Sequence, residues 1–451
     1  MQNSLNLKSM SGTTPGKLRL AMVAIFILSV CFALAGYFAV TGARDAVNTI
    51  ARDAVPSIVT AQNVRVKLLE MDALASQEFL AGGAASGAQA RLKYEAVRQE
   101  LGAQLTLAAK NISFGKEEQT PIELLAEKVQ VYNGMVESAR ANNRQGFPVG
   151  AAYLRMASTM LHDEMLPQTQ AIDQLNVKQL ESEYASFKSS SLMRIGSILA
   201  AGVALLVVLL YVQFFISKNM RRTFNAPLLV ASAAVVLLTG YSVIGMTMQR
   251  ANLGDAKEGS FVSAYNWLEA RGIAYDTKTD QSLYLIALGA GAKYEVSAKA
   301  KVEKLAPMDV ALTKVNADIN GKVSFKGIFA DEITSKAAGS TAQRDALAAL
   351  NSLRTYLEQD VRIRELDKGG KRAQAVNLAL GNGEATAQEA FDNFNQVLSN
   401  NLNKATDNFE ASVSSAESNI RFLDIAFIVL ALLVAAMAYF GLTPRINEYR
   451  V

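Results

Sequence analysis

The sequence predicts an all-α integral membrane protein with four transmembrane helices and two exported antiparallel helical bundles arranged as a duplication. Three observations lead to this fold class. Half of the 451 residues are hydrophobic, and four long stretches contain no charged side chain. The two long segments between them have helical periodicity and few strand signals. These two segments also begin and end in similar ways.

The four uncharged stretches are each close to the roughly 20 residues that a helix needs to cross a ~30 Å hydrocarbon core. A backbone exposed to lipid must satisfy its own hydrogen bonds, so these stretches are expected to be helices. In chain order the predicted spans are residues 20–41, 195–217, 227–248 and 425–442.

Positive charge predicts the orientation of the spans. The arm 1–19, the turn 218–226 and the tail 443–451 carry formal charges of +3, +3 and +1, while the whole chain carries +4. Lysine and arginine beside a span favour the cytoplasmic side. We therefore expect these three segments, with both termini, to be cytoplasmic at the plasma membrane. Segments 42–194 and 249–424 are expected to be exported.

The first span is expected to be an uncleaved anchor. Its apolar stretch is longer than the 7–15 residues of a typical signal-peptide core. Cys31 follows Leu28-Ser29-Val30, which is a poor match to a lipoprotein cleavage site. Cleavage would leave the sidedness of the other segments unchanged.

Breaks at glycine-rich or polar clusters divide the first exported segment into four helices. These are expected at about 43–80, 88–110, 121–141 and from 149 into the second span. The second segment is expected to break near 289–294, 320–327, 369–370 and 381–384, with one extra short piece. Apolar stripes with steps of three and four residues predict the core faces: Leu154, Ala157, Leu161 and Met165, and then Phe391, Phe394, Leu398, Leu402, Ala405, Phe409 and Val413.

The two exported segments have matching positions. Asp72, Gln77 and Phe79 align with Asp276, Gln281 and Leu283 at a constant offset of 204 residues. Each segment also ends in a helix rich in serine and alanine that leads into the next span. We interpret the chain as two copies of one unit, a helical bundle attached to two membrane helices.

Composition excludes most catalytic chemistry. The chain has one cysteine, inside a predicted span, and one histidine. Disulfides, serine triads that use histidine and Cys/His zinc sites are therefore not expected. His162 precedes Asp163 and Glu164, but we interpret it as a helix-surface residue. We find no phosphate-binding loop or kinase motif, and we expect no enzyme, cofactor, metal or nucleic-acid partner.

One exported stretch offers a candidate ligand or partner patch, formed by Trp267, Arg271 and Tyr275. Arg271 and Tyr275 are four residues apart and share a helix face. An arginine fork there could accept a carboxylate through two hydrogen bonds. The alternatives are a protein-docking surface and an ordinary bundle helix with a solvated arginine.

The short cytoplasmic segments supply the remaining candidate residues. Cations beside a span usually set topology and contact anionic lipid, which accounts for the charges of the turn. The arrangement of the tail is less readily explained in this way, and Pro444 is expected to end the fourth helix. The candidate partner-binding residues are Lys218, Arg221, Arg222, Asn225, Pro227, Pro444, Arg445, Glu448, Tyr449 and Arg450.

The unit of a bundle and two spans resembles the four-helix-bundle sensor domains of chemoreceptors and sensor kinases. Three stretches, RRTFNAPLL (221–229), YLRMASTMLHDEMLPQ (153–168) and LTPRINEYR (442–450), resemble the GlnX family of actinobacterial membrane proteins. That resemblance implies a relay of glutamate or aspartate sensing. An amino-acid-binding lipoprotein, GlnH, would meet the exported bundles, and the Ser/Thr kinase protein kinase G would respond inside the cell.

Three functions remain open from the sequence. The first is a signalling relay whose partners supply ligand binding and catalysis, and the second is a sensor that binds a small ligand directly. The third is a structural subunit of a transport complex. For the relay we expect a small helix displacement that repositions the turn and the tail. The sequence leaves the ligand and the oligomeric state open, including a homo-oligomer.

Overall fold

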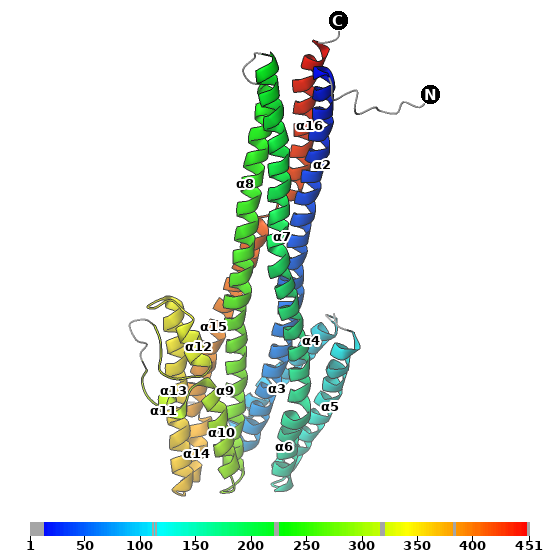
Figure 1. The fold of residues 1–451 in the computed structure, drawn as a ribbon. Helices are drawn as coiled ribbons and strands as arrows, with labels where there is room; N and C mark the ends of the chain where they lie inside the picture. The colour runs from blue at the N-terminus through cyan, green and yellow to red at the C-terminus, as the bar shows by residue number, and fades with distance from the viewer. Residues whose placement is uncertain are drawn as a thin grey trace. The chain divides into compact units, whose positions relative to one another are not determined.

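The protein was analysed as a computed structural model that describes residues 13–110, 112, 115–220, 225–315, 321–381 and 385–448. It is 89% helical, and the described residues contain no strand. The predicted all-α fold class is confirmed. Four helices are long and apolar enough to cross a membrane, so the chain is a multi-pass membrane protein (Figure 1).

The helices of the first half include two π-helices, labelled η1 and η2. In chain order the elements are α2 (Thr14–Val47), η1 (Asn48–Ala54), α3 (Val55–Ala81), α4 (Ala85–Lys110), α5 (Lys116–Arg144), α6 (Val149–Met160), η2 (Leu161–Met165) and α7 (Leu166–Met220).

The second half contains a third π-helix, η3, and several shorter helices. Its elements are α8 (Ala226–Gly254), η3 (Asp255–Phe261), α9 (Val262–Ile286), α10 (Ala292–Leu305), α11 (Met308–Ala311), α12 (Ile328–Thr334), α13 (Thr341–Lys368), α14 (Arg372–Leu380), α15 (Ala387–Ser418) and α16 (Leu423–Asn447).

The chain divides into two compact units, and the boundaries fall in η1, α7, η3 and α15. The first unit comprises residues up to 52, 180–256 and from 410 onward, and the second comprises 53–179 and 257–409. The first unit contains the four candidate membrane spans. The second contains both helical bundles.

Within the first unit, α2, α7, α8 and α16 lie side by side (Figure 1). The start of α2, the end of α7, the start of α8 and the end of α16 lie at the same end of this unit. Small residues allow close approach of these helices, as expected for membrane helix packing. An added Cβ at Gly36 of α2 would lie 2.3 Å from the ring of Phe427 on α16. The same ring packs edge-on against Phe32, with ring centroids 5.1 Å apart.

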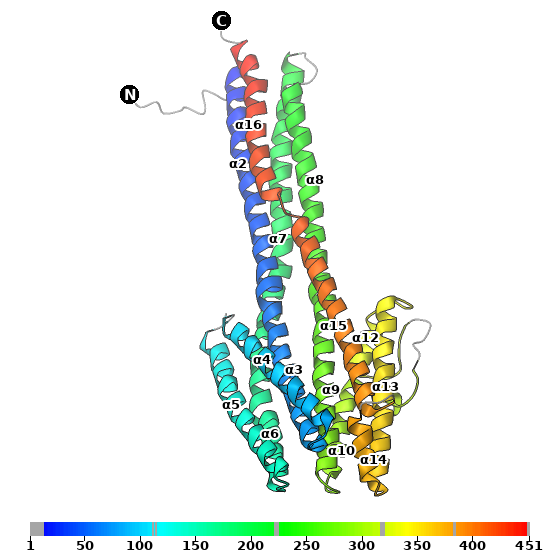
Figure 2. The same cartoon turned by 180° about the vertical axis from the view of Figure 1, so that it is seen from behind.

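Within the second unit, the two bundles pack against each other through α3 and α9. Figure 2 shows α4, α5 and α6 on the side of α3, and α10, α13 and α15 on the side of α9. One apolar core runs through both bundles. The first predicted stripe lies in it, with Leu154, Ala157, Leu161 and Met165 at most 1% exposed. The second stripe lies in it from Phe391 to Ala405, whereas Phe409 and Val413 lie outside this core. The predicted core faces are confirmed there.

The structure adds matched positions to the repeat found in the sequence. Tyr132 of α5 and Tyr356 of α13 are both 0% exposed and are separated by 224 residues. Arg140 and Arg364 have the same separation, and each guanidinium lies over a tyrosine ring of its own bundle, at 4.5 and 4.7 Å. The larger offset on α13 is explained by an insertion in the second bundle, which includes α11 and α12.

Two expectations about helix ends need correction. Pro444 does not end the fourth membrane helix, since α16 continues through it to Asn447. Proline in a helix removes one backbone hydrogen bond, and here the loss falls in the last turns, where few bonds remain to be broken. In the first bundle α5 starts at Lys116, ahead of Pro121, with Glu117 and Glu118 in its first turn. Acidic residues at that position favour the helix dipole.

Candidate functional site

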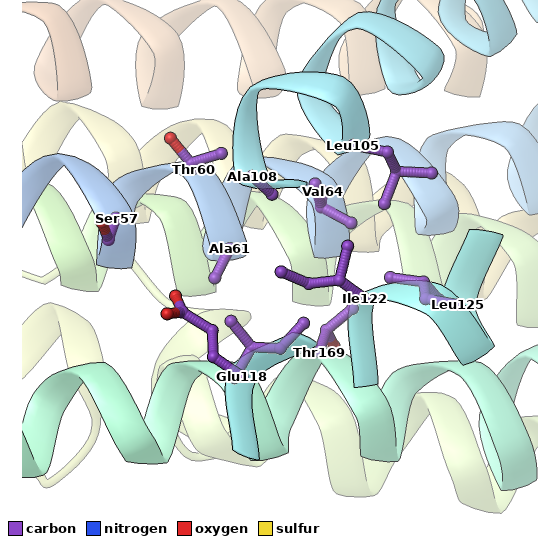
Figure 3. Close-up of a pocket in the computed structure, with 11 residues that line it drawn as sticks. Ser57, Thr60, Ala61, Val64, Leu105, Ala108, Glu118, Ile122, Leu125 and Thr169 are labelled. Carbon is purple, nitrogen blue, oxygen red and sulfur yellow. The ribbon is translucent and has the colours of Figure 1, made fainter. Parts of the chain in front are cut away.

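A cavity enclosed by α3, α4, α5 and α7 lies inside the first bundle (Figure 3). It leaves about 10 Å³ for the centres of water molecules, which is room for about one water. Its wall is mostly apolar, but the carboxylate of Glu118, a residue only 3% exposed, lies on its Ser57 side, away from Leu105 and Leu125. As it stands, the cavity is too small for an organic ligand.

A cluster of polar side chains lies at the contact between the two bundles. It surrounds Asp72 and Asp276, the two aspartates that occupy matching positions in the repeat. Asp72 of α3 is 0% exposed. Its two carboxylate oxygens accept hydrogen bonds from the hydroxyls of Tyr132, at 3.0 Å, and Ser158, at 2.7 Å. Burial raises the pKa of the Asp72 carboxyl, although the nearby His162 and the two hydroxyls oppose that effect.

His162 of η2 connects the first bundle to the second. Its Nδ1 lies 2.8 Å from the carbonyl oxygen of Ser158, and its Nε2 lies 2.8 Å from Oδ1 of Asp276 on α9. Burial lowers the pKa of the imidazole, but the hydrogen bond and charge of Asp276 outweigh burial and raise it to about 9. The protonated ring donates at both nitrogens. The interpretation of His162 as a helix-surface residue is therefore wrong.

Asp276 is shared between the two bundles. Besides His162, its Oδ1 accepts a hydrogen bond from Nζ of Lys301 on α10, at 2.7 Å. The same ammonium donates to Oδ2 of Asp280 at 2.6 Å. Burial alone would raise the pKa of Asp276, but His162 and Lys301 hold it below its ordinary value. Two cations thus stabilise one carboxylate at the bundle contact.

The structure joins Arg271 and Tyr275 through Asn395, whereas the Trp267 ring packs against Phe329. The Tyr275 hydroxyl donates to Oε1 of Glu70 at 2.9 Å and accepts from Nδ2 of Asn395 at 3.0 Å. Nε of Arg271 donates to Oδ1 of Asn395 at 3.2 Å. A carboxylate of the chain itself, Glu70 of the first bundle, thus occupies the position next to Tyr275.

Trp267 belongs to the core of the second bundle. It is 3% exposed, and its ring packs against Phe329 with centroids 6.0 Å apart. Its side chain is therefore not available to an external partner in this conformation.

Lys278, which the sequence did not single out, is fully buried in the second bundle. Its ammonium donates to Oε1 of Gln281 at 2.9 Å and lies 5.8 Å from the ring centroid of Tyr356. Burial lowers the pKa of Lys278 to about 8. Gln281, the repeat partner of Gln77, in turn donates to Oδ1 of Asp360 at 2.9 Å. The signal in the sequence was the unbroken polar run TKTDQS (277–282), whose six side chains are all buried.

The predicted cytoplasmic residues fall partly outside the described part of the chain. Arg221, Arg222, Tyr449 and Arg450 lie outside it. Lys218 lies in the last turn of α7, and Pro227 in the first turn of α8. Arg445 pairs with Glu448, one helical turn away.

Asn225 joins the turn to the end of the fourth predicted span. It is the residue before α8, and its side chain does not cap that helix. Instead its Nδ2 donates to the carbonyl oxygen of Gly441 on α16, at 2.7 Å. The residue is 8% exposed. The turn, chosen from the sequence as a candidate partner surface, is therefore connected by a buried hydrogen bond to the end of the fourth predicted span, next to the tail.

The described residues contain no group of three or more His, Cys, Asp or Glu side chains placed to hold a metal ion. The polar clusters above are instead closed hydrogen-bond networks, and most of their groups have partners within the chain. Such networks favour one arrangement of the helices that carry them.

The first bundle is similar to a known family of domains. Residues 46–185 match the family described as actinobacterial sensor domain. No curated protein matches the chain. The matched range begins at the end of α2 and extends into α7, so it covers the whole first bundle, including Asp72, Tyr132, Ser158 and His162. The chain is thus a multi-pass membrane protein whose first bundle is similar to an actinobacterial sensor domain, which supports a sensing role.

Proposed function

We propose that the protein is a transmembrane signal relay. Its exported bundles receive information about an extracytoplasmic amino acid of the glutamate or aspartate class through a binding lipoprotein, and its cytoplasmic segments regulate a Ser/Thr kinase. The observation that carries the sensing role is the match of residues 46–185 to a sensor domain. The identity of the partners rests on the resemblance to the GlnX family.

Helix continuity supports the relay mechanism. α7 runs without interruption from Leu166, beside the sensor core, to Met220 in the predicted turn. A packed helix is stiff, so a displacement of one end is transmitted along its axis. Asn225 then links the start of α8 to α16, so one movement would act on both cytoplasmic segments.

The size of the enclosed cavity supports sensing through a partner over direct binding in that cavity. The space inside the first bundle accommodates about one water, whereas small-molecule pockets usually measure about 300–1,000 Å³. A ligand placed there would require the helices to separate.

A more open cavity at the α3–α4 turn offers a surface for the lipoprotein. It has a volume of about 380 Å³ and is lined by Phe79 and Leu154 together with Arg91 and Arg144. Neither of these two arginines forms an ion pair within the part of the chain that the structure describes. We propose that an acidic surface of the lipoprotein binds here, because the two guanidinium groups would pair with its carboxylates.

The test is a binding measurement on the full chain in lipid nanodiscs. A purified amino-acid-binding lipoprotein, with and without glutamate, is passed over the immobilised protein, and glutamate alone is titrated by calorimetry. The proposal expects lipoprotein binding that depends on glutamate, weakened by Arg91→Glu with Arg144→Glu. Micromolar binding of glutamate to the protein alone, with no lipoprotein binding, would instead establish the direct sensor.

A further inference from the structure

A cavity of about 500 Å³ lies in the first unit, where α2 passes into η1 and α15 ends. Three arginines line it, Arg44, Arg52 and Arg421, together with the hydroxyls of Ser414 and Ser418. Arg44 follows the end of the first predicted span by three residues, and Arg421 precedes the fourth by four. The cavity therefore lies at the level where the hydrocarbon core is expected to give way to lipid headgroups.

The charge of this cavity is only partly neutralised. Arg44 pairs with Asp424 at 3.2 Å, and Arg52 pairs with Glu417 at 2.7 Å. Arg421 has no ion pair among the described residues. Three guanidinium groups thus face two carboxylates.

Donors remain available on these side chains. A guanidinium has five N–H donors, and the side chains of Arg44 and Arg52 are 39% and 63% exposed. Exposed ion pairs are weak, typically worth less than about 1 kcal/mol. Glu417 and Asp424 therefore leave the arginines free to contact a further anion.

Exposed apolar side chains lie on α2 and at the start of α16, on the span side of the cavity. Phe38 of α2 is 66% exposed, and Phe422 and Ile425 at the start of α16 are 65% and 58% exposed. The Arg421 guanidinium lies 5.2 Å from the ring centroid of Phe422. A ligand that suits this surface has an anionic head for the arginines and an apolar chain for the span.

The helical path from the second bundle into the fourth span is also interrupted at this point. η1 and η3 continue α2 and α8 directly into α3 and α9, whereas α15 ends at Ser418 and α16 begins only at Leu423. The intervening turn is held by the Arg44 guanidinium, whose Nη2 donates to the carbonyl oxygen of Arg421 at 3.3 Å. A ligand that contacts Arg44 and Arg421 would therefore contact both sides of this turn.

We propose that this cavity binds the phosphate group of an anionic phospholipid. Arg421 and Arg52 contact the phosphate oxygens, because arginine pairs with phosphate through two parallel hydrogen bonds. Ser414 donates from its hydroxyl, and the acyl chains follow the apolar surface of α2 and α16. The site does not depend on which signal the sensor receives. Free phosphate has the same head chemistry, so the test must distinguish the two sources.

The experiment uses the full chain, purified, stripped of lipid in detergent and then offered defined lipids. Retention of phosphatidylglycerol is compared with that of phosphatidylcholine of the same acyl chains by native mass spectrometry. In a separate arm, inorganic phosphate is titrated and thermal unfolding is followed. We expect preferential retention of phosphatidylglycerol, reduced about fivefold by Arg421→Gln, since one cation near an anionic surface contributes about that factor.

Two further variants test whether the effect is specific. Arg421→Lys keeps the positive charge and should retain part of the preference. Arg362→Gln removes an exposed arginine of α13, in the other unit, and should leave lipid retention unchanged. Size-exclusion elution and helical circular dichroism identical to wild type would show that each variant is folded.

Three results would overturn the proposal. The first is equal retention of the two lipids by the wild-type protein, and the second is an equal loss in Arg421→Gln and Arg362→Gln. The third is stabilisation by inorganic phosphate without any lipid preference, which would assign the site to a free anion.

Discussion

His162 and Asp276, 114 residues apart in the chain, are joined at 2.8 Å across the contact between the two bundles. This pair connects the domain that matches a sensor family to its repeat. Because His162 is the one histidine of the chain, its protonation can be followed without interference from another imidazole.

Nuclear magnetic resonance of protein labelled at histidine, and purified without a histidine tag, should show one imidazole that titrates near pH 9. The reason is that the charge and hydrogen bond of Asp276 stabilise the protonated ring more than burial disfavours it. Asp276→Asn should lower the midpoint, since it removes that charge and leaves the burial. A midpoint near the ordinary 6.5 in the wild-type protein would show that the pair does not form.

The same pair should make stability depend on pH. A histidine whose pKa is raised in the folded protein contributes to the free energy of unfolding. This contribution is complete below about pH 6.5, the pKa of an unfolded histidine, and it is lost as the pH rises towards 9. Thermal unfolding in detergent should therefore show a lower midpoint at pH 8 than at pH 6.5 for the wild type. His162→Gln, which cannot titrate, should show a smaller change over that range. Equal changes in the two proteins would contradict the assignment.

Removing one of the two hydroxyls that donate to Asp72 should destabilise the fold. Tyr132→Phe leaves a fully buried carboxyl group with one hydrogen bond fewer, and a hydrogen bond to a charged group contributes about 1.5–3 kcal/mol. We expect a lower unfolding midpoint by several degrees. Tyr153→Phe is the matched control, because the Tyr153 hydroxyl forms no hydrogen bond within the described residues. A midpoint unchanged in Tyr132→Phe would mean that water replaces the lost partner.

Gly36 should tolerate no side chain. An added Cβ would lie 2.3 Å from the Phe427 ring, and overpacking of a close contact costs about 1–3 kcal/mol. Gly36→Ala should therefore lower the unfolding midpoint, and Phe427→Leu should partly restore it. Gly196→Ala on α7 is the control, since nothing lies within 4 Å of its added Cβ. Equal effects of the two alanines would argue against the α2–α16 contact.

The relay predicts that the cytoplasmic arginines are needed for output. Replacing Arg221, Arg222, Arg445 and Arg450 together by Gln should abolish kinase-dependent phosphorylation in cells. Membrane insertion, checked by the accessibility of cysteines introduced in the exported segments, should be unchanged. Asn225→Ala removes the bond to Gly441 and should weaken the output without affecting charge. Full output in a correctly inserted quadruple variant would exclude these arginines from the kinase contact.

Local sequence patterns were enough to predict the helices, the spans and the core faces. A long stretch without charged residues predicts a membrane span. Apolar residues spaced three and four positions apart predict which face of a helix is buried. The contacts of the candidate site could not be predicted in this way, because periodicity does not tell which helix a buried face meets. His162 looked like a surface residue beside two acids, yet its partner is Asp276 of the other bundle.

The same limit explains the other differences. Trp267, the one tryptophan of the chain, was a plausible ligand contact, but aromatic size favours core burial equally well, and the residue packs against Phe329. Asn225 has the residue type of a helix cap, while its amide binds Gly441, 216 residues away. Each of these outcomes depends on tertiary packing and leaves no trace in the nearby sequence.

The π-helices η1 and η3 give the chain a way to rotate a helix without unfolding it. A π-helix contains more residues per turn than an α-helix and is often found at functional positions. If one residue passes from η1 into α3, the side chains beyond it turn around the helix axis by the difference between the rotations per residue of the two helix types. A change in η1 would then reach α3 as a change of angle, with backbone hydrogen bonds exchanged at the junction of the two helix types.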